Sequence, residues 1–422
     1  MSDSVSFGKK HQKLNDSSLV MSDYWFLFGM LVVVFWAIDP FDVKFDVRPL
    51  IKHFPVFVIA PAFVLSFMGA VLFGNFNHKN RAGSGGPYPW LSVIPFAFFV
   101  IAGSIAARFV YKIENTFLTM GLYALAVPVT IWFIVRAGNP GLLVRRLLQI
   151  YIFWSLIAIG MQAAYFGKRD VFHPKEHLVL GSLTLIFFLS KNNFTKIFSL
   201  LFIGATAIIA HKNTAYLTAL LIYAYIFLVW VVVHWRTIFD GMKRTAFGIK
   251  VGIFMVIGAG VVLLAYTQRG TSQPSGNPEY RLATYAKAWE KFLHSPIWGN
   301  GFTGAATEKF DKYTVAVSTQ VLPTHSDPLD ILAGGGVIGF IFWLAFFIGL
   351  ARSWYACVKR SGDPTSEKLL PYIHTLYCMV FTGVLVCMFN PILNAPNLAW
   401  SFWAAGGALL ALIFTMSKQP LN

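Results

Sequence analysis

Long runs of apolar residues recur along the chain and alternate with short polar segments. Each run holds roughly 20 residues, the length that an α-helix needs to cross the hydrocarbon core of a bilayer. The pattern predicts about twelve membrane-spanning helices and therefore an all-α polytopic membrane protein. The runs begin near Tyr24, Phe54, Trp90, Thr116, Leu147, Leu178, Ile197, Thr214, Val251, Ile331, Tyr372 and Leu398.

Two of these runs, 178–190 and 197–210, are shorter than the others. Segments of that length are often buried or re-entrant rather than spanning. A re-entrant pair would carry the polar connection KNNFTK into lipid, where polar groups without partners are costly. We therefore interpret both runs as spans.

The apolar pattern has one long interruption, between Thr267 and Pro328. Loops of this length are uncommon in compact proteins and are usually functional. The interruption divides the chain into three parts. Residues 1–266 carry the first nine helices, residues 267–329 form an outer loop with short helices, and residues 330–422 carry the last three helices.

Within the outer loop, the stretch NPEYRLATYAKAWEKFLH predicts a helix. Asn277 and Pro278 suit its first turn, and the Ser295-Pro296 pair suits its end. Apolar residues recur at three- and four-residue spacing, so we expect one apolar face that lies on the membrane surface. These residues are Leu282, Tyr285, Trp289, Phe292 and Leu293.

The chain re-enters the membrane at HSDPLDILAGGGVIG, residues 325–339. Asp327, Pro328 and Asp330 have the order of a helix start: a capping residue, a first-turn proline and an acid near the positive end of the helix dipole. The helix start does not account for His325, which stands just before it at the outer water–lipid boundary. We expect the glycines that follow to let neighbouring helices pack closely; they are Gly334, Gly335, Gly336 and Gly339.

Composition and charge agree with a membrane protein, since 56% of the residues are hydrophobic and 12% are charged. Basic residues of the short loops predominate on one side, which indicates that this side, with both termini, is cytoplasmic. No lysine or arginine lies in the middle of a predicted span, which argues against pumps, voltage sensors and ion-coupled carriers. The net charge of +16 is spread over both faces and favours anionic lipid head groups rather than nucleic acid as partners.

The N-terminal segment does not resemble a removable signal peptide. Its first 23 residues contain Asp3, Asp16 and Asp23 and have neither an apolar core nor a small-residue cleavage site. We therefore expect the first helix to stay as an anchor.

Residues that would indicate metal, redox or nucleotide chemistry are sparse. The three cysteines form no disulfide or metal framework. Asp39, Asp42 and Asp46 in the first outer loop fit no metal-ligand spacing, and we interpret them as solvated loop acids. Neither a nucleophile–base pair nor a glycine-rich phosphate loop is evident. We expect no metal and no cofactor.

The outer side carries residues suited to the transfer of a sugar from a lipid pyrophosphate to a hydroxyl. Fixed positive charge stabilises the leaving pyrophosphate, and a histidine can take the proton of the hydroxyl. Arg269 at the end of the ninth helix, Arg281 in the surface helix and Lys212 in the turn AHKNTAY supply cations. His325 supplies the base. Each residue alone is more often structural, so their occurrence on one face is what favours a site.

The stretch EYRLATYAKAWEKFLHSPIWGNGFTG, followed by HSDPLDILAGGGVIG, resembles the shared region of the O-antigen ligase and O-antigen polymerase superfamily. In that superfamily an arginine opens a helix, a P-x-x-G-x-G turn follows, and a histidine precedes the next span. The ligase pattern is a histidine, then Asn, Ser or Gln, then nine residues and Gly-x-x-Gly. Here it is met by His325, Ser326, Gly336 and Gly339.

The resemblance implies a lipopolysaccharide O-antigen ligase of a Gram-negative inner membrane, with the polytopic GT-C-like fold of an inverting, metal-independent glycosyltransferase. Such enzymes move a glycan from undecaprenyl pyrophosphate to lipid A-core on the periplasmic side. By this resemblance His325 would activate or position the acceptor hydroxyl, while Arg281, Arg269 and Lys212 would bind the pyrophosphate. Many members carry Ser-Arg where this chain has His211 and Lys212, a change that keeps the charge but loses the guanidinium fork.

Three alternatives remain open. A polymerase of the same superfamily would join lipid-linked repeat units with much the same residues, and the spacing from His325 to the glycines is what favours a ligase. A transporter or flippase for lipid-linked sugars belongs to a different class, which tends to have broken helices and polar groups at mid-depth. The charges of this chain cluster outside the spans instead. An interaction scaffold with an outer domain would give His325 no specific role.

Overall fold

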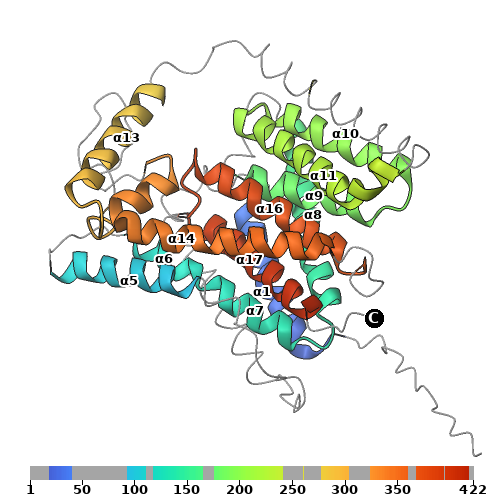
Figure 1. Cartoon of the computed structure of the whole chain (residues 1–422), viewed down its shortest axis with the longest axis horizontal. Helices are drawn as coiled ribbons and strands as arrows, with labels where there is room; N and C mark the ends of the chain where they lie inside the picture. The colour runs from blue at the N-terminus through green and yellow to red at the C-terminus, as the bar shows by residue number, and fades with distance from the viewer. Residues whose placement is uncertain are drawn as a thin grey trace, which may run out of the picture.

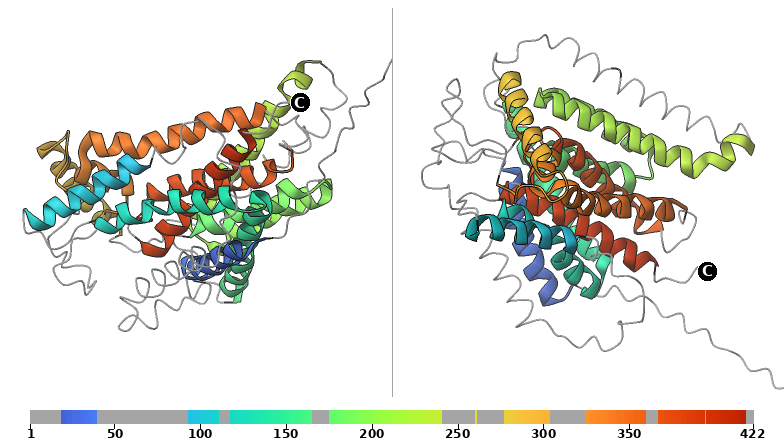
Figure 2. Two further views of the ribbon diagram at one scale, coloured as in Figure 1. Left: turned by 90° about the horizontal axis from the view of Figure 1, so that it is seen from below. Right: turned by 60° about the vertical axis from the view of Figure 1, so that its left-hand side comes forward.

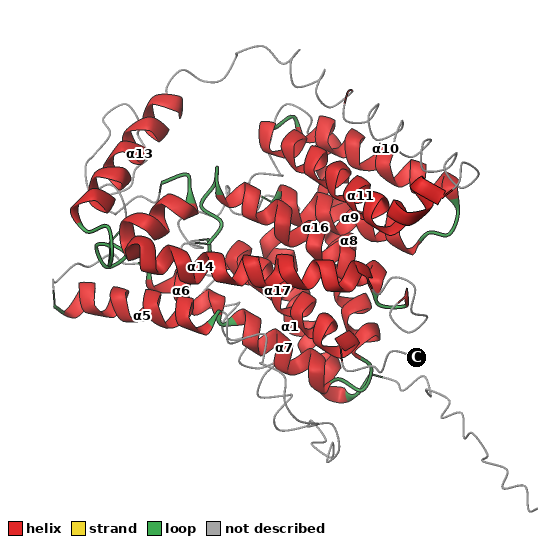
Figure 3. Ribbon diagram, viewed as in Figure 1, coloured by secondary structure: helices red, strands yellow, loops and turns green. Residues whose placement is uncertain are grey.

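The computed structural model of the chain describes residues 19–39, 93–110, 117–164, 175–240, 260, 277–303, 324–359, 367–393 and 395–417. Every regular element in these ranges is a helix, as Figure 3 shows. Among the described residues, eight helical segments are long and apolar enough to cross a membrane, one of them Leu118–Arg136. The predicted run near Phe54, most of the run near Val251, and Arg269 lie outside the described residues.

Every predicted run that falls within the described ranges contains a helix, and the predicted run near Thr116 is divided at Leu125. The helices, labelled in Figure 1, are α1 (Met21–Ile38), α5 (Ile94–Phe109), α6 (Leu118–Ala124), α7 (Ala126–Arg136), α8 (Pro140–Ala164), α9 (Glu176–Leu189), α10 (Asn193–Ala210), α11 (Asn213–Asp240), α13 (Asn277–His294), α14 (Asp327–Lys359), α16 (Leu370–Cys387) and α17 (Pro396–Ser417).

The short helix α9 is an internal element of the bundle. Its 14 residues are buried along almost the whole length of the helix, and α16, α10, α8 and α11 all pack against it. The closest approach is to α16 at Gly181, where a Cβ would lie 2.9 Å from the Cα of Met379. A helix surrounded by protein does not need the length of a lipid-facing span.

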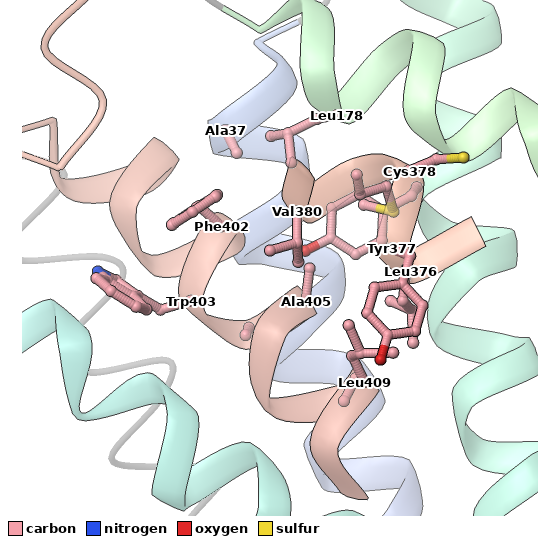
Figure 4. Packing of buried hydrophobic residues seen from close by; sticks show 14 of the residues in the cluster. Ala37, Leu178, Leu376, Tyr377, Cys378, Val380, Phe402, Trp403, Ala405 and Leu409 are labelled. Atoms are coloured by element: carbon pink, nitrogen blue, oxygen red, sulfur yellow. The ribbon is translucent and has the colours of Figure 1, made fainter. Parts of the chain in front are cut away.

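The core of the bundle is formed by α16 and α17 with α1 and α9. Figure 4 shows Phe402 of α17 on the side of Val380 of α16, while Trp403 points away from α16. Trp403 is fully buried, and its ring centroid lies 5.2 Å from that of Phe346 in α14. Because lipid tails are as apolar as these side chains, such packing stabilises the bundle through close contact and dispersion rather than by exclusion of water.

Hydrogen bonds and close contacts bring several helix ends to one end of the bundle. The Nζ of Lys175, at the start of α9, donates to the carbonyl of Asp39 at the end of α1. Thr214, at the start of α11, donates to Glu176 in α9. A Cβ at Gly383, near the end of α16, would lie 3.0 Å from the ring of His177 in α9. Asp327 joins the start of α14 to the segment between α16 and α17.

The helix α13 lies at this same end, because it packs against the first part of α14. Figure 1 shows α13 at one end of the molecule and the end of α17 away from it, and the two further directions of Figure 2 agree. The predicted site residues on α13 and before α14 are therefore far from Ser417, where α17 ends.

Candidate active site

One face of α13 packs on the first turns of α14. Ala288 is buried and forms a small apolar cluster with Ala333 and Leu329 of α14. Arg281 lies seven residues before Ala288 in the sequence, and Lys291 lies three residues after it. Residues at these intervals lie on the same side of a helix. The face of α13 that meets α14 therefore carries two cations around an apolar centre.

The other side of α13 differs in part from the predicted apolar face. Leu282, Trp289 and Leu293 are 68%, 49% and 60% exposed and point away from the protein. Tyr285, which we had grouped with them, is instead partly buried and lies against His325 at the start of α14. The prediction was wrong for Tyr285 because a tyrosine at this spacing suits either an apolar face or a polar contact.

The segment that follows α13, residues 295–303, docks onto a break in α14. At Gly336 the backbone has φ 60° and ψ −163°, which interrupts the helical hydrogen bonds. The carbonyl and N–H groups of α14 that have no helical partner at the break form hydrogen bonds with the backbone of this segment. The N–H groups of Asn300 and Gly301 donate to the carbonyls of Ala333 and Gly334 at 3.0 and 2.9 Å, and the N–H of Val337 donates to the carbonyl of Pro296 at 2.8 Å. The P-x-x-G-x-G turn and the glycine run are thus two halves of one junction.

Glycines on both sides allow this close approach. A Cβ at Gly336 would collide with the backbone of Ile297, and a Cβ at Gly334 would lie 2.7 Å from the ring of Phe302. The predicted role of these glycines in close packing with a neighbouring helix is wrong for Gly334 and Gly336, because their neighbour is the 295–303 segment. Gly335 meets both Phe302 of that segment and Phe99 of helix α5. For Gly339 the prediction is confirmed, since its neighbour is Phe99 of helix α5.

His325 lies in a turn just before α14 that is held by several hydrogen bonds. The Oγ1 of Thr324 donates to the carbonyl of Ser326 at 2.8 Å and accepts from the N–H of Ser326 at 3.2 Å. The N–H of Thr324 donates to Oδ1 of Asp330 at 3.0 Å. From α13, the hydroxyl of Tyr285 donates to the carbonyl of His325 at 3.4 Å. The backbone on both sides of the imidazole is therefore fixed.

Asp327 does not use its Oδ2 to cap its own helix, so its predicted capping role was wrong. The Oδ2 atom accepts from the N–H groups of Ile392 and Leu393 at 2.8 and 2.9 Å. A buried carboxylate requires donors, and the connection between α16 and α17 supplies them. Asp327 thereby links the turn of His325 to the last two helices.

The electrostatic environment keeps His325 neutral. Burial lowers the pKa of His325 to about 4, and the positive charge of Arg281 acts in the same direction. At neutral pH the imidazole is therefore unprotonated and can accept a proton. The Nε of Arg281 is buried and has no hydrogen-bond partner among the described residues. The guanidinium beside His325 thus retains a donor for an anionic ligand.

Asp330 also influences α13 across the contact. Burial lowers the pKa of Lys291, and the negative charge of Asp330 raises it again. Burial likewise raises the pKa of the Tyr285 hydroxyl, which stays protonated and can donate to His325. The carboxylate of Asp330 therefore interacts with both the turn before α14 and the face of α13.

Lys212 lies in a second polar group at the same end of the bundle. It precedes α11 in the tight turn after α10, where His211 has a positive φ of 52°. Two residues later, Thr214 is hydrogen-bonded to Glu176 in α9. The structure thus brings Arg281 and His325 together and places Lys212 on the side of α9 and α11. Arg269 lies outside the described residues.

The aspartates of the first outer loop differ from our interpretation where the structure describes them. Asp39 is 2% exposed and ends α1 in a left-handed conformation, so it is not a solvated loop acid. Asp42 and Asp46 lie outside the described residues. Within the described ranges, no group of three or more His, Cys, Asp or Glu residues could hold a metal ion.

Sequence reasoning missed three residues that surround His325. Thr324 immediately precedes it, and a Thr-x-Ser order is a signal for a side-chain turn. Tyr285 follows Arg281 by four residues and so shares its side of the helix. Lys291 follows Tyr285 by six residues on the same helix. The sequence gives no sign that Lys291 is near Asp330, because their proximity depends on how α13 packs on α14.

Comparison with known families finds a match over the part of the chain that carries these residues. Residues 197–344 match the family model described as O-Antigen ligase. The matched region, about a third of the chain, includes Lys212, Arg281 and His325 together with the glycine junction. The chain therefore carries a domain of the O-antigen ligase superfamily. No curated protein matches the chain.

Proposed function

We propose that this chain, which carries a domain of the O-antigen ligase superfamily, is an O-antigen ligase of the bacterial inner membrane. It would transfer O-antigen from undecaprenyl pyrophosphate to lipid A-core at the periplasmic face. The observation that carries the proposal is the pairing of Arg281 with a neutral His325 inside the matched region. One group suits a pyrophosphate and the other suits the hydroxyl that attacks.

Arg281 would bind the pyrophosphate of the donor. A guanidinium offers several donors in one plane and matches phosphate oxygens, and its charge stabilises the oxygens on which negative charge develops when the sugar leaves. Lys212 and Arg269 would add positive charge to the same site. The position of Lys212 at the same end of the bundle supports its part in this assignment.

His325 would act on the acceptor. The oxygen of the acceptor hydroxyl attacks C1 of the donor sugar, the bond from C1 to the phosphate oxygen breaks, and the electron pair leaves with the lipid pyrophosphate. The proton of the hydroxyl passes to the neutral imidazole of His325. One direct displacement of this kind inverts the configuration at C1 and requires no metal or nucleotide.

Donor binding would also adjust the base. In the free protein the charge of Arg281 contributes to the low pKa of His325. A pyrophosphate anion bound to Arg281 neutralises that charge, so the pKa of His325 rises in the complex. The contribution of burial remains. His325 therefore becomes a stronger base only when the leaving group is in place.

The orientation in the membrane follows from the basic residues. Arg136, Arg145, Arg146 and Lys191 lie at or near helix ends opposite the starts of α9 and α14. By the positive-inside rule, that end is cytoplasmic. The end that carries α13, His325 and Lys212 would then face the periplasm, where both glycolipids would reach it.

Deletion of the gene followed by analysis of the lipids tests the assignment. A ligase is supported if full-length polymer accumulates on undecaprenyl pyrophosphate and lipid A-core carries no O-antigen. Single repeat units on lipid A-core would indicate a polymerase instead. Donor confined to the cytoplasmic leaflet would indicate a flippase, and unchanged lipids would contradict all three functions.

A further inference from the structure

We propose that Thr324 and Asp330 are positioning residues, which hold His325 at a fixed place relative to Arg281. The inference rests on the proposed function and extends it to residues that touch neither substrate. It is carried by a continuous set of hydrogen bonds that surrounds the imidazole-bearing residue on both sides and reaches across to α13.

The first part of this set is the side chain of Thr324. Its single hydroxyl contacts both backbone groups of Ser326, since Oγ1 donates to the carbonyl at 2.8 Å and accepts from the N–H at 3.2 Å. These bonds close a turn whose central residue is His325. Thr324 is fully buried and Ser326 is 6% exposed, so water cannot readily replace the hydroxyl.

The second part is the carboxylate of Asp330, one turn into α14. Its Oδ1 accepts from the N–H of Thr324 at 3.0 Å, which fixes the entry to the turn. Asp330 is 1% exposed, so water cannot readily replace this bond. Asp330 thus fastens the turn to its own helix.

The third part comes from α13 itself. Tyr285 lies one turn after Arg281 and donates its hydroxyl to the carbonyl of His325. The helix that carries the guanidinium therefore also holds the backbone of the histidine. Loss of the turn around Thr324 would leave Arg281 in place on α13 but would leave His325 held to α13 through the bond from Tyr285 alone among the hydrogen bonds described above.

Several charged or titratable groups face this turn, and each must be considered in a pH experiment. From α13 they are Arg281, Tyr285 and Lys291. From α14 they are Asp327 and Asp330. The α16–α17 connection presents backbone N–H groups to Asp327, and the thiol of Cys387 is hydrogen-bonded to the same carboxylate.

A pair of substitutions at Thr324 tests the inference in the full-length protein. Thr324→Val keeps the shape and removes the hydroxyl, whereas Thr324→Ser keeps the hydroxyl. We expect Thr324→Val to lower kcat by about tenfold or more, while the KM for the lipid-linked donor changes by less than about twofold. Thr324→Ser should keep at least about half of the wild-type kcat, because it can re-form both bonds to Ser326.

The pH dependence separates positioning from general damage. In Thr324→Val a less constrained His325 gains contact with water, so its pKa rises and the acidic limb of kcat/KM moves to higher pH. A variant that merely unfolds in part loses amplitude without a shift of this limb. As a matched control, Thr375→Val removes a buried hydroxyl that bonds only to the helix carbonyl of Pro371. It should leave the limb unchanged.

The remaining outcomes either support or overturn the inference. If Thr324→Val does not fold, Asp330→Leu takes its place, because leucine has a similar size and removes the acceptor of the Thr324 N–H; it should lower kcat and move the acidic limb in the same direction. Wild-type kcat and pH profile in whichever valine or leucine variant folds would overturn the positioning role. Full activity in His325→Ala would instead overturn the proposed function.

Discussion

The hydroxyl of Tyr285 donates a hydrogen bond to the carbonyl of His325 at 3.4 Å, across the contact between α13 and α14. The two residues are 40 positions apart in the chain. Their contact joins the helix that carries Arg281 to the turn that carries the histidine. A cation and a neutral imidazole are thereby held at one end of a helical bundle.

Substitution of His325 should abolish transfer without loss of the fold. The imidazole is only partly buried, and the hydrogen bonds of its turn involve backbone atoms and other side chains. We expect His325→Ala to reduce the rate of glycan transfer by about 10²-fold or more, the usual contribution of a general base. The measurement is transfer from donor lipid to lipid A-core by purified protein. Size-exclusion chromatography in detergent checks the fold, and a rate within about threefold of wild type would contradict the role.

Arg281 should be needed for use of the donor, and lysine should replace it only in part. An ammonium group supplies a point charge but not the planar set of donors that matches two phosphate oxygens. We expect Arg281→Ala to raise the donor KM and lower kcat, and Arg281→Lys to recover part of both. Full recovery by lysine would exclude a two-point contact with the pyrophosphate. Lys287 lies on the same helix, and Lys287→Ala serves as the matched loss of one positive charge.

The pH profile should reveal the effect of Arg281 on His325. The pKa of His325 is lowered to about 4 in the free protein. The value of kcat/KM reports on the free enzyme, so it should fall only as the pH approaches about 4. The acidic limb of kcat should lie at higher pH, since bound pyrophosphate neutralises the arginine. Removal of the positive charge in Arg281→Ala should move the limb of kcat/KM upward. A limb that stays in place in this variant would show that the two side chains do not interact.

The glycine junction should be sensitive to one added methyl group at Gly336. Gly336 has φ 60°, and a Cβ there would collide with the backbone of Ile297. We expect Gly336→Ala to cost about 1–2 kcal/mol or more from backbone strain alone and to detach the segment after α13. Gly349 is the control in the same helix, because a Cβ there meets nothing within 4 Å. Limited proteolysis near residue 300 and transfer activity would distinguish the two variants, since only Gly336→Ala should be cleaved faster and lose activity. Equal cleavage and activity in both variants would contradict the contact between Gly336 and Ile297.

Chelation should have no effect on transfer. The proposed reaction uses positive charge from arginine and lysine side chains, so EDTA should leave the rate unchanged. Loss of activity in EDTA that magnesium or manganese restores would indicate that Asp42 and Asp46 bind a metal ion. Zinc-free buffers serve as the control for inhibition by trace metal.

Much of the fold could be predicted because hydropathy reports directly on contact with lipid. Runs of apolar residues gave the order of the helices wherever the structure describes them, and the surface helix could be predicted from its end signals at Asn277 and Ser295. The limits of single helices were less certain. α8 begins at Pro140, whereas the apolar run begins near Leu147. Arg145 and Arg146 lie in the first two turns of the helix, and their charge makes those turns look like a loop in the hydropathy pattern.

The contacts of the site were harder to predict because they depend on packing between distant segments. A run of three glycines before a valine is equally compatible with a close helix neighbour and with a break, and only the docked segment decides between them. Asp327 has the local pattern of a cap, yet its partners are more than 60 residues further along the chain. Arg281 and His325 could be proposed from the sequence because their chemistry, and the resemblance of the surrounding motifs, do not depend on knowledge of these partners.

Residues 296–302 complete the broken α14 through paired backbone groups, and this pairing fixes the number of residues between α13 and the junction. One inserted or deleted residue in that stretch would move every donor out of register with its acceptor. One residue inserted into α14 before Gly336 would do the same, because the carbonyls of Ala333 and Gly334 would no longer meet the N–H groups of Asn300 and Gly301. The lengths of the two segments are therefore fixed together, and a change in one requires a compensating change in the other.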